Sequence, residues 1–330
     1  MFVKRAFLPL AALPFVLAAD GDLPQLGLPI ACKIGQSCAI QHYVDIDPTP
    51  GARDYHCGAR TYDKHDGIDF RIKSMADARR GVAVLAAADG TVLSLRDGMP
   101  DISVKIAGLA SVAGRECGNG VVIDHGSGIQ TQYCHMLRSS LVVKPGQAVK
   151  VGTPLGKVGM SGDAEFPHLH FIVRQAGKPI DPFAYGAKPG ACGGGGRNLW
   201  APSAGLADPY RAGEVLNSGF ATGPVTMVAV DESGADQQPR PTRDAPAIVA
   251  FVRAIGLEGG DVQTLSLAAP DGTMLSENRA QPLDRNKAQW LIFAGKKRPA
   301  AGWPAGRYAA LYVVKRAGKT VIEQRFALQL

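Results

Sequence analysis

A chain of 330 residues with 46% hydrophobic and 20% charged side chains is long enough for two domains and too apolar to be disordered. Its 40 glycines and 23 prolines favour short strands and turns over long helices. The net charge of +7 comes from scattered lysines and arginines, with no basic run that aromatic residues interrupt. This pattern argues against a nucleic-acid partner and fits a polyanionic surrounding such as a cell wall.

Residues 1–19 predict a secretory signal peptide. A short positive stretch, Met1–Arg5, precedes an apolar run over 6–19. A transmembrane helix needs about 20 apolar residues. This run is shorter, and Pro9 and Pro14 interrupt it. We therefore expect an exported protein, periplasmic or extracellular, with no transmembrane segment in the mature chain.

Export changes how the cysteines are interpreted. Their even number, 6, predicts disulfides in an oxidising compartment. The absence of a Cys-x-x-Cys pair argues against a cysteine-based zinc site. Many pairings are possible, but a turn at 125–128 can bring two cysteines together across a hairpin. The expected set is Cys117–Cys134 across that turn, Cys32–Cys38 closing a small loop, and the remaining pair Cys57–Cys192.

The chain divides into segments of different composition. Residues 20–60 are rich in Pro, Gly and Asp and predict an irregular, disulfide-tied segment packed against the main domain. Residues 61–189 alternate short apolar runs with turn signals, which predicts an antiparallel all-β domain with little helix. Its expected strands form a hairpin over 82–95 around Asp89-Gly90, a hairpin over 121–135, and strands at 149–151, 155–158, 167–174 and 179–180.

A second β pattern follows a glycine-rich linker at 190–204. Residues 205–330 predict a β-sandwich domain, because regular short strands alternate with turns. No histidine and no cysteine follows Cys192, so this part offers no catalytic metal site. The expected strands are 225–230, 247–255, 262–267, 290–294, 307–314 and 321–328.

The strand expected at 167–174 carries two histidines on one face. Successive strand residues point to opposite faces, so His168 and His170 share one face while Leu169 and Phe171 face the other way. Two imidazoles side by side on a rigid strand can hold a metal, or a metal and a proton. Chance also produces such pairs, and the assignment therefore depends on partners elsewhere in the chain.

Possible partners occur in two other segments. His65 and Asp69 lie in a stretch whose Gly67 disfavours a helix, and in an extended conformation this glycine leaves the face between them unobstructed. His135 ends a strand-like run just before a loop. Taken separately, the first segment would be a surface turn and His135 an ordinary half-buried histidine.

Taken together, these residues predict a metal-dependent hydrolytic site. His65, Asp69 and His170 supply two imidazoles and a carboxylate, the three protein ligands of a catalytic zinc with an open position. His135 and His168 then remain beside it to transfer a proton or stabilise an oxyanion during peptide-bond hydrolysis.

The other three histidines fall outside these segments. His125 follows Asp124 in a turn and is expected to be structural. His42 and His56 are candidates for lining a cleft, although exposed or satisfied histidines are commoner.

The order of these motifs resembles that of the lysostaphin/LytM-type M23 metallopeptidases. The resemblance implies a compact antiparallel β domain with one zinc bound by His65, Asp69 and His170. It also implies that His135 and His168 are catalytic and that the substrate is the peptide part of peptidoglycan. The matching segments are His65–Phe70, Tyr133–His135, Val143–Val149, Pro167–Phe171 and the closing Lys178–Pro182.

Two positions depart from the family pattern. Phe166 stands where many members have glycine, and Ile172 where many have an acidic residue. Both positions are expected beside the cleft, so the departures concern substrate preference rather than metal binding.

The leading interpretation is a monomeric zinc-dependent endopeptidase that cleaves peptidoglycan cross-links or stem peptides in cell-wall remodelling. One alternative is a non-catalytic wall-binding or amidase-activating regulator of the same fold, which the complete set of five site residues disfavours. A further alternative is a secreted protease that acts on proteins. The sequence leaves open whether the N-terminal segment covers the cleft.

Overall fold

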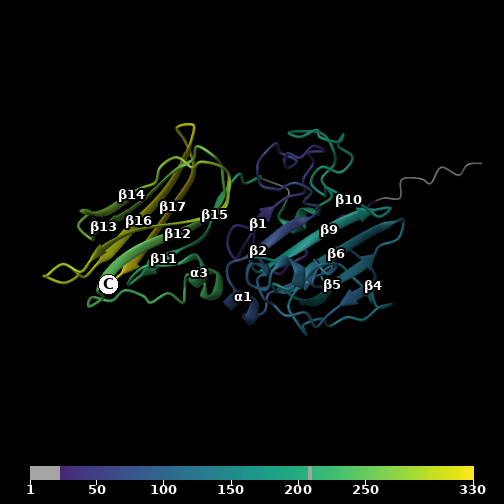
Figure 1. Cartoon of the computed structure of the whole chain (residues 1–330), viewed down its shortest axis with the longest axis horizontal. Helices are drawn as coiled ribbons and strands as arrows, with labels where there is room; N and C mark the ends of the chain where they lie inside the picture. Colours follow the sequence, from purple (N-terminus) through teal and green to yellow (C-terminus); the bar gives the residue numbers. More distant parts are fainter. Residues whose placement is uncertain (1–22, 207–209) are drawn as a thin grey trace, which may run out of the picture.

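The computed structural model describes residues 23–206 and 210–330, which form two lobes side by side (Figure 1). The signal peptide expected over 1–19 lies outside the described residues. Within the described ranges, no helix is long and apolar enough to cross a membrane.

The first lobe is built on an eight-stranded sheet in which every pair is antiparallel. The strand order is β1-β2-β9-β6-β5-β4-β7, and β10 pairs with β9. This confirms the antiparallel β domain expected from the sequence. The strands are β1 (Cys38–His42), β2 (Ile68–Ile72), β4 (Gly90–Arg96), β5 (Asn119–Asp124), β6 (Ile129–Met136), β7 (Ala148–Val149), β9 (His168–Gln175) and β10 (Lys178–Ile180).

Smaller elements complete this lobe. Strands β3 (Ala83–Leu85) and β8 (Pro154–Lys157) form a separate two-stranded sheet. The short helices are α1 (Met75–Arg80), α2 (Val104–Ala107) and the 3-10 turns η1 (Leu109–Ser111) and η2 (Pro202–Ala204).

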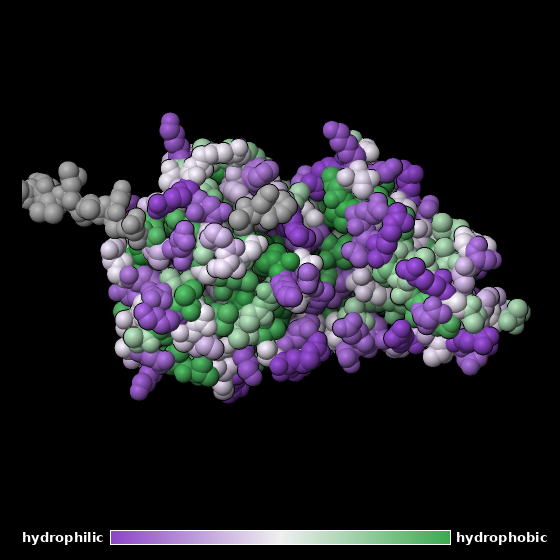
Figure 2. Space-filling view, turned by 180° about the vertical axis from the view of Figure 1, so that it is seen from behind, coloured by the Kyte–Doolittle hydropathy of each residue, from purple (hydrophilic) through white to green (hydrophobic). Residues whose placement is uncertain are grey.

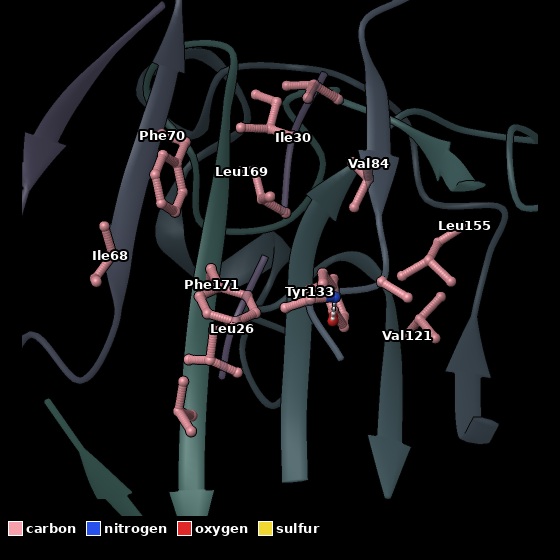
Figure 3. Close-up of a cluster of buried hydrophobic side chains, with 14 of the residues drawn as sticks. Leu26, Ile30, Ile68, Phe70, Val84, Val121, Tyr133, Leu155, Leu169 and Phe171 are labelled. Atoms are coloured by element: carbon pink, nitrogen blue, oxygen red, sulfur yellow. Dashed lines mark hydrogen bonds between the residues drawn. The ribbon is translucent and has the colours of Figure 1, made fainter. Parts of the chain in front are cut away.

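The first lobe's core lies on one face of the large sheet (Figure 3). Phe70 on β2, Tyr133 on β6 and Leu169 and Phe171 on β9 all point into it. Burial of each such side chain contributes about 1.5–3 kcal/mol, which fixes the register of β9 because a shift by one residue would expose this set. The expected alternation on β9 is confirmed, since the core side chains leave the opposite face to its histidines.

The N-terminal segment is more regular than expected. Its strand β1 is an edge strand of the large sheet, and Ile40 lies opposite Phe70 while His42 lies opposite Asp69. A strand of five residues that begins at a disulfide cysteine shows too short an alternation of apolar and polar residues to be recognised in the sequence. Its Ile40 is nevertheless buried in the core. All three expected disulfides are confirmed: Cys32–Cys38, Cys57–Cys192 and Cys117–Cys134.

The hairpin expected over 82–95 is wrong. Strand β3 pairs with β8, and β4 pairs with β5 and β7. The backbone of Ala86 bonds to Gly152 and Thr153, and the carbonyl of Ala87 accepts from Gly27. The run between the two strands is thus held by other segments, and the chain does not fold back on itself at Asp89-Gly90.

The second lobe is a β-sandwich, as expected. A three-stranded sheet, β11-β12-β15, faces a four-stranded sheet, β14-β13-β16-β17. Alternate residues of both sheets, such as Val252 on β12 and Tyr312 on β16, share one buried core. The strands are β11 (Glu214–Ala221), β12 (Ala247–Leu257), β13 (Val262–Ala268), β14 (Met274–Arg279), β15 (Lys287–Lys297), β16 (Arg307–Arg316) and β17 (Lys319–Gln329).

The strand expected at 225–230 is wrong. This stretch contains the start of helix α3 (Met227–Ser233), which Thr226 caps by accepting from the backbone N–H of Ala229. Val230 is buried while Val228 is exposed, so the apolar run does not have two buried faces. The cap and tertiary packing override the strand propensity of the valines.

Buried charges join the two lobes where α1 and α3 lie side by side (Figure 1). The guanidinium of Arg71 on β2 donates to Asp231 at 3.1 Å and to Gln289 at 2.8 Å. Arg253 on β12 also bonds to Asp231 and donates to the carbonyl of Lys73 at 2.7 Å. From behind, hydrophilic side chains are prominent along the constriction between the lobes (Figure 2).

The exact domain limits, 61–189 and 205–330, stay predictions. Leu199 and Trp200, inside the linker expected at 190–204, are buried in the first lobe's core.

Candidate metal centre

Three side chains converge on the face of the large sheet opposite its core. Asp69 on β2 lies directly opposite His170 on β9, and His65 lies just before β2. Asp69 Oδ1 is 2.8 Å from His170 Nδ1 and 3.2 Å from His65 Nε2. The two imidazole nitrogens are 3.2 Å apart. All three donor atoms lie within 4.8 Å of one another, which is close enough to share one metal ion.

Hydrogen bonds on the far side of each imidazole select its tautomer. His65 Nδ1 donates to the carbonyl of Tyr43 at 2.7 Å, which leaves the Nε2 lone pair directed at Asp69. His170 Nε2 lies 3.2 Å from the carboxylate of Asp66, which accepts from it and leaves Nδ1 for the site. His65 thus presents an unprotonated nitrogen to the site. Burial lowers the pKa of His170, but its hydrogen bonds to Asp66 and Asp69 outweigh this effect and raise the pKa to about 9, so its Nδ1 carries a proton that a bound metal would replace.

Gly67 is needed between the two ligands of the first segment. A Cβ at this position would lie 2.7 Å from His170 Cε1 and 2.7 Å from the carbonyl oxygen of Phe171. Any side chain would therefore displace His170 or the backbone of β9.

Two further histidines lie beside the three ligands. His135 and His168 have ring centroids 4.6 Å apart, and both are buried. His135 Nδ1 donates to the carbonyl of Ser161 at 2.7 Å, and His168 Nδ1 donates to that of Phe166 at 2.8 Å. Each ring therefore keeps Nε2 as its free nitrogen, and that of His168 is 3.5 Å from Asp69 Oδ1.

A bulge at the end of β6 sets the direction of His135. Its φ is +61°, in the left-handed region, and the pairing of β5 with β6 shifts register between Asn119 and Val121. The backbone N–H of His135 donates to the carbonyl of Cys117 at 2.8 Å, next to the Cys117–Cys134 disulfide. By simple alternation His135 would point to the face opposite that of Cys134, which pairs with His170. The bulge turns His135 to the metal-centre face instead.

Residues 63–182 match the family model of Peptidase family M23, and all five converging residues lie within this range. This part of the chain is an M23 peptidase domain. The four histidines and one aspartate predicted from the sequence are thus brought together by one domain, whereas their individual roles stay predictions.

Curated relatives of the M23 domain include endopeptidases and a cell division protein. Peptidoglycan DD-endopeptidase ShyB of Vibrio cholerae is 41% identical over 117 residues, or 36% of this chain and 22% of the relative. DD-carboxypeptidase/endopeptidase Mpg of Neisseria meningitidis is 32% identical over 124 residues, covering 37% of this chain and 23% of the relative. Cell division protein DipM of Caulobacter vibrioides is 34% identical over 128 residues, covering 37% and 17%. The matches span only about a fifth of these relatives' length.

Solved structures with a similar fold include a zinc-containing peptidase from Vibrio cholerae. It is 27% identical with a TM-score of 0.28 and covers 43% of this chain and 38% of its own. The catalytic domain of lysostaphin from Staphylococcus simulans is 22% identical with a TM-score of 0.28 and covers 43% and 85%.

The charges around His65, Asp69 and His170 suit a bound cation. Burial favours the neutral acid, but the neighbouring imidazoles of His65 and His168 and the hydrogen bonds from His170 and His42 hold the pKa of Asp69 well below its usual range. No lysine or arginine bonds to this buried carboxylate among the described residues, so a proton on His170, or a metal in its place, supplies the compensating charge. Two nitrogens and one carboxylate oxygen are the donor set of a catalytic zinc site.

The two outer histidines are held neutral. Burial lowers the pKa of His168 to about 4, with Asp69 opposing the shift. Burial, and then the nearby imidazoles of His168 and His170, hold the pKa of His135 well below its ordinary value. Neutral imidazoles with Nδ1 protonated present a basic Nε2, which is the form that accepts a proton.

Sequence reasoning missed the role of His42. Its Nδ1 donates to Asp69 Oδ2 at 2.8 Å, the carboxylate oxygen that does not face His65 and His170. Only a prediction of β1 and of its register against β2 could have placed it there, and no motif marks that strand. His56 instead stacks on Tyr210, with ring centroids 4.3 Å apart.

The structure also places His125. Its Nδ1 donates to the carbonyl of Asp89 at 2.7 Å and its Nε2 lies 2.8 Å from Thr131 Oγ1, which is the structural role that was expected.

A cleft of about 530 Å³ opens onto the centre. This volume is in the range of small-ligand sites, about 300–1,000 Å³. The first lobe forms the wall of the cleft that carries the metal centre, and residues of the second lobe also line the cleft. The lining includes His42, Arg60, Tyr62, Asp69, His135, Asp163, Glu165, Phe166, His168 and His170, with Gly256, Leu257, Asn286, Lys287 and Ala288 from the second lobe.

Proposed function

We propose that this protein is an exported, monomeric zinc-dependent endopeptidase that hydrolyses peptide bonds in peptidoglycan during cell-wall remodelling. The observation that carries the proposal is the convergence of three donor atoms within 4.8 Å beside two more neutral imidazoles. The names of the relatives ShyA and ShyB, both peptidoglycan DD-endopeptidases of Vibrio cholerae, support peptidoglycan as the substrate.

One zinc per chain would be held by His65, Asp69 and His170. When bound, zinc polarises a carbonyl group and lowers the pKa of a water molecule. The chain's own groups position and move protons. Tyr43 and Asp66 hold the two ligand rings in the tautomers that face the site.

His135 and His168 would carry the proton transfers. Each ring is locked by a bond from Nδ1 to a backbone carbonyl, so only Nε2 is available to the substrate. During attack of water on the peptide carbonyl, one Nε2 accepts the proton of the attacking water. Once protonated, an imidazole donates a hydrogen bond to the developing oxyanion or a proton to the leaving amine.

A regulator without catalytic activity is the second candidate of the sequence analysis. The geometry favours the enzyme, because a regulator needs neither the tautomer-fixing bonds of the ligands nor a proton-transfer pair. All five side chains and all four of their second hydrogen bonds are present.

The test is digestion of purified peptidoglycan by the zinc-reconstituted full chain, followed by mass spectrometry of the released muropeptides. Fragments with a new amine and a new carboxylate at a peptide bond are expected, and their masses identify the bond. A zinc-loaded protein that releases no fragments would contradict the proposed activity, and cleavage confined to casein-like proteins would favour a general protease.

A further inference from the structure

The second lobe lines the same cleft as the metal centre. Gly256 and Leu257, at the end of β12, and Asn286–Ala288, where the chain enters β15, share the cleft with His168 and His170. A peptide that reaches the metal centre therefore also meets residues that lie 86 to 120 positions further along the chain.

Hydrogen bonds fix this wall relative to the metal centre. Gln41 Nε2 donates to the carbonyl of Ala288 at 2.8 Å, and Gln41 Oε1 accepts from the buried Arg71 at 2.8 Å. The next residue along β1 is His42, which bonds to Asp69. Two consecutive residues of one strand thus bond to the wall and to the metal centre.

The cationic side chains that line the cleft, among the described residues, are Arg60 and Lys287. Both terminal nitrogens of the Arg60 guanidinium are engaged, because they donate to the carbonyls of Ile40 and Arg211 and to Glu214. Its side chain is 1% exposed, so it cannot turn toward a ligand. This leaves Lys287 as the cation that a substrate can reach.

The ammonium of Lys287 is held by a bond that a substrate can replace. Its Nζ lies 2.6 Å from Asp284 Oδ1, and the Asp284 side chain is 66% exposed. The Lys287 side chain is 15% exposed, and its Nζ also lies 5.6 Å from the centre of the Trp290 ring. Because the Asp284 partner faces solvent, the ion pair contributes only about 0–1 kcal/mol.

The first lobe's rim of the cleft has the opposite charge. Asp163 and Glu165 line it. Burial, followed by the charges of Glu116 and Glu165, raises the pKa of Asp163. A carboxylate on the substrate is repelled by these acids and attracted by Lys287, so the charges orient an acidic peptide with its anionic group toward the second lobe.

We propose that Lys287 of the second lobe binds a carboxylate of the peptide substrate, so that the β-sandwich selects peptides with a free carboxylate near the scissile bond. This inference rests on the proposed peptidase function and names its substrate class. The sandwich is then a part of the substrate site rather than a separate attachment module.

The test compares kcat/KM on two synthetic stem peptides that differ only in a carboxylate or carboxamide near the cleaved bond. Lys287→Ala is expected to lower kcat/KM on the carboxylate peptide about tenfold, mainly through KM, and to leave the carboxamide peptide unchanged. Lys287→Gln is expected to behave like Lys287→Ala, and Lys287→Arg to recover most of the loss. Truncating the lobe is unsuitable, because it would leave Arg71 buried without Asp231.

Arg285→Ala is the matched control, because it removes the same charge two positions before Lys287. The Arg285 side chain is 78% exposed and does not line the cleft. This variant is expected to equal the wild type on both peptides. Equal effects of Lys287→Ala and Arg285→Ala would overturn the inference while leaving the peptidase intact. A wild type that cleaves neither the peptides nor peptidoglycan would overturn the proposed function and the inference with it.

Discussion

His42 donates from Nδ1 to Oδ2 of Asp69 at 2.8 Å, from the edge strand β1 to its neighbour β2. The other oxygen, Oδ1, faces the nitrogens of His65 and His170. The carboxylate is therefore held from one side while it presents a single oxygen to the metal centre. Such second partners orient a ligand and keep it charged.

Replacing His42 by alanine is expected to weaken zinc binding about 10–100-fold, because the Asp69 carboxylate loses the bond that orients it. The measurement is zinc affinity of the full chain by competition with a chelator, which does not depend on turnover. His56→Ala is the control, since this histidine of the same segment stacks on Tyr210 away from the centre. Equal affinities in the two variants would contradict the role of His42.

A second set of variants distinguishes residues that bind the zinc from residues that transfer protons, because zinc content and turnover are measured separately. His65→Ala and His170→Ala are each expected to abolish zinc binding, because two protein ligands do not hold a catalytic zinc. His135→Ala is expected to retain about one zinc per chain, judged from the three-ligand site, and to lose at least about 10²-fold in turnover. Elemental analysis and muropeptide release give the two readouts.

His135 requires a conformational control because its φ is +61°. Asparagine tolerates this left-handed conformation better than alanine, so His135→Asn should lose turnover with less disturbance of the β6 bulge. If His135→Asn digests peptidoglycan at the wild-type rate, the proton-transfer role assigned to His135 is wrong.

The metal-centre segments were predictable because their information is local. The alternation of β9 puts Leu169 and Phe171 in the core and leaves the histidines on the other face. Gly67 between His65 and Asp69 has a steric reason that can be anticipated from the sequence, since a side chain there collides with His170.

Features that depend on distant partners were not predictable. His42 reaches Asp69 only because β1 adds to the sheet edge in one register, and nothing in residues 20–60 encodes that pairing locally. Arg71 bonds to Asp231, which lies 160 residues away in helix α3. The valines of this helix led the sequence analysis to predict a strand there. The wall at Lys287 likewise exists only once the two lobes are in contact.

The junction between the lobes depends on Asp231. Arg71 and Arg253 are both fully buried and both bond to this carboxylate. Asp231→Ala is expected to destabilise the protein by about 3–5 kcal/mol, because two buried guanidinium groups lose their counter-ion. Glu232→Ala, next in sequence and 57% exposed in its pair with Arg79, should change stability by about 1 kcal/mol or less. Equal thermal unfolding of the two variants would contradict this account of the junction.

The disulfides should differ in their contribution to stability. Cys57 and Cys192 are 135 residues apart in sequence, whereas Cys32 and Cys38 are 6 apart. The entropy of closing these loops predicts a loss of about 5 kcal/mol for the double serine variant of the first pair and about 2 kcal/mol for the second. Thermal unfolding of the two double variants tests the order, and a larger loss from the short loop would contradict it.

Asp181 should make stability depend on pH. Its Oδ2 is buried without a hydrogen-bond partner, and burial raises the pKa of this carboxyl from 3.8 to about 7. Between these values the folded protein keeps a proton that the unfolded chain has released. The contribution of Asp181 to the free energy of unfolding therefore falls by about 1.4 kcal/mol per pH unit through this window. This contribution is constant below and above the window.

Asp181→Asn removes this titration and retains an acceptor for the backbone N–H of Phe183, which bonds to Oδ1 at 2.8 Å. The variant is expected to be more stable than the wild type by about 2–4 kcal/mol at pH 8, with the difference vanishing toward pH 4. Other groups titrate equally in both proteins, so the difference in unfolding free energy isolates this carboxyl. A difference that stays constant from pH 4 to pH 8 would show that Asp181 ionises normally in the folded protein.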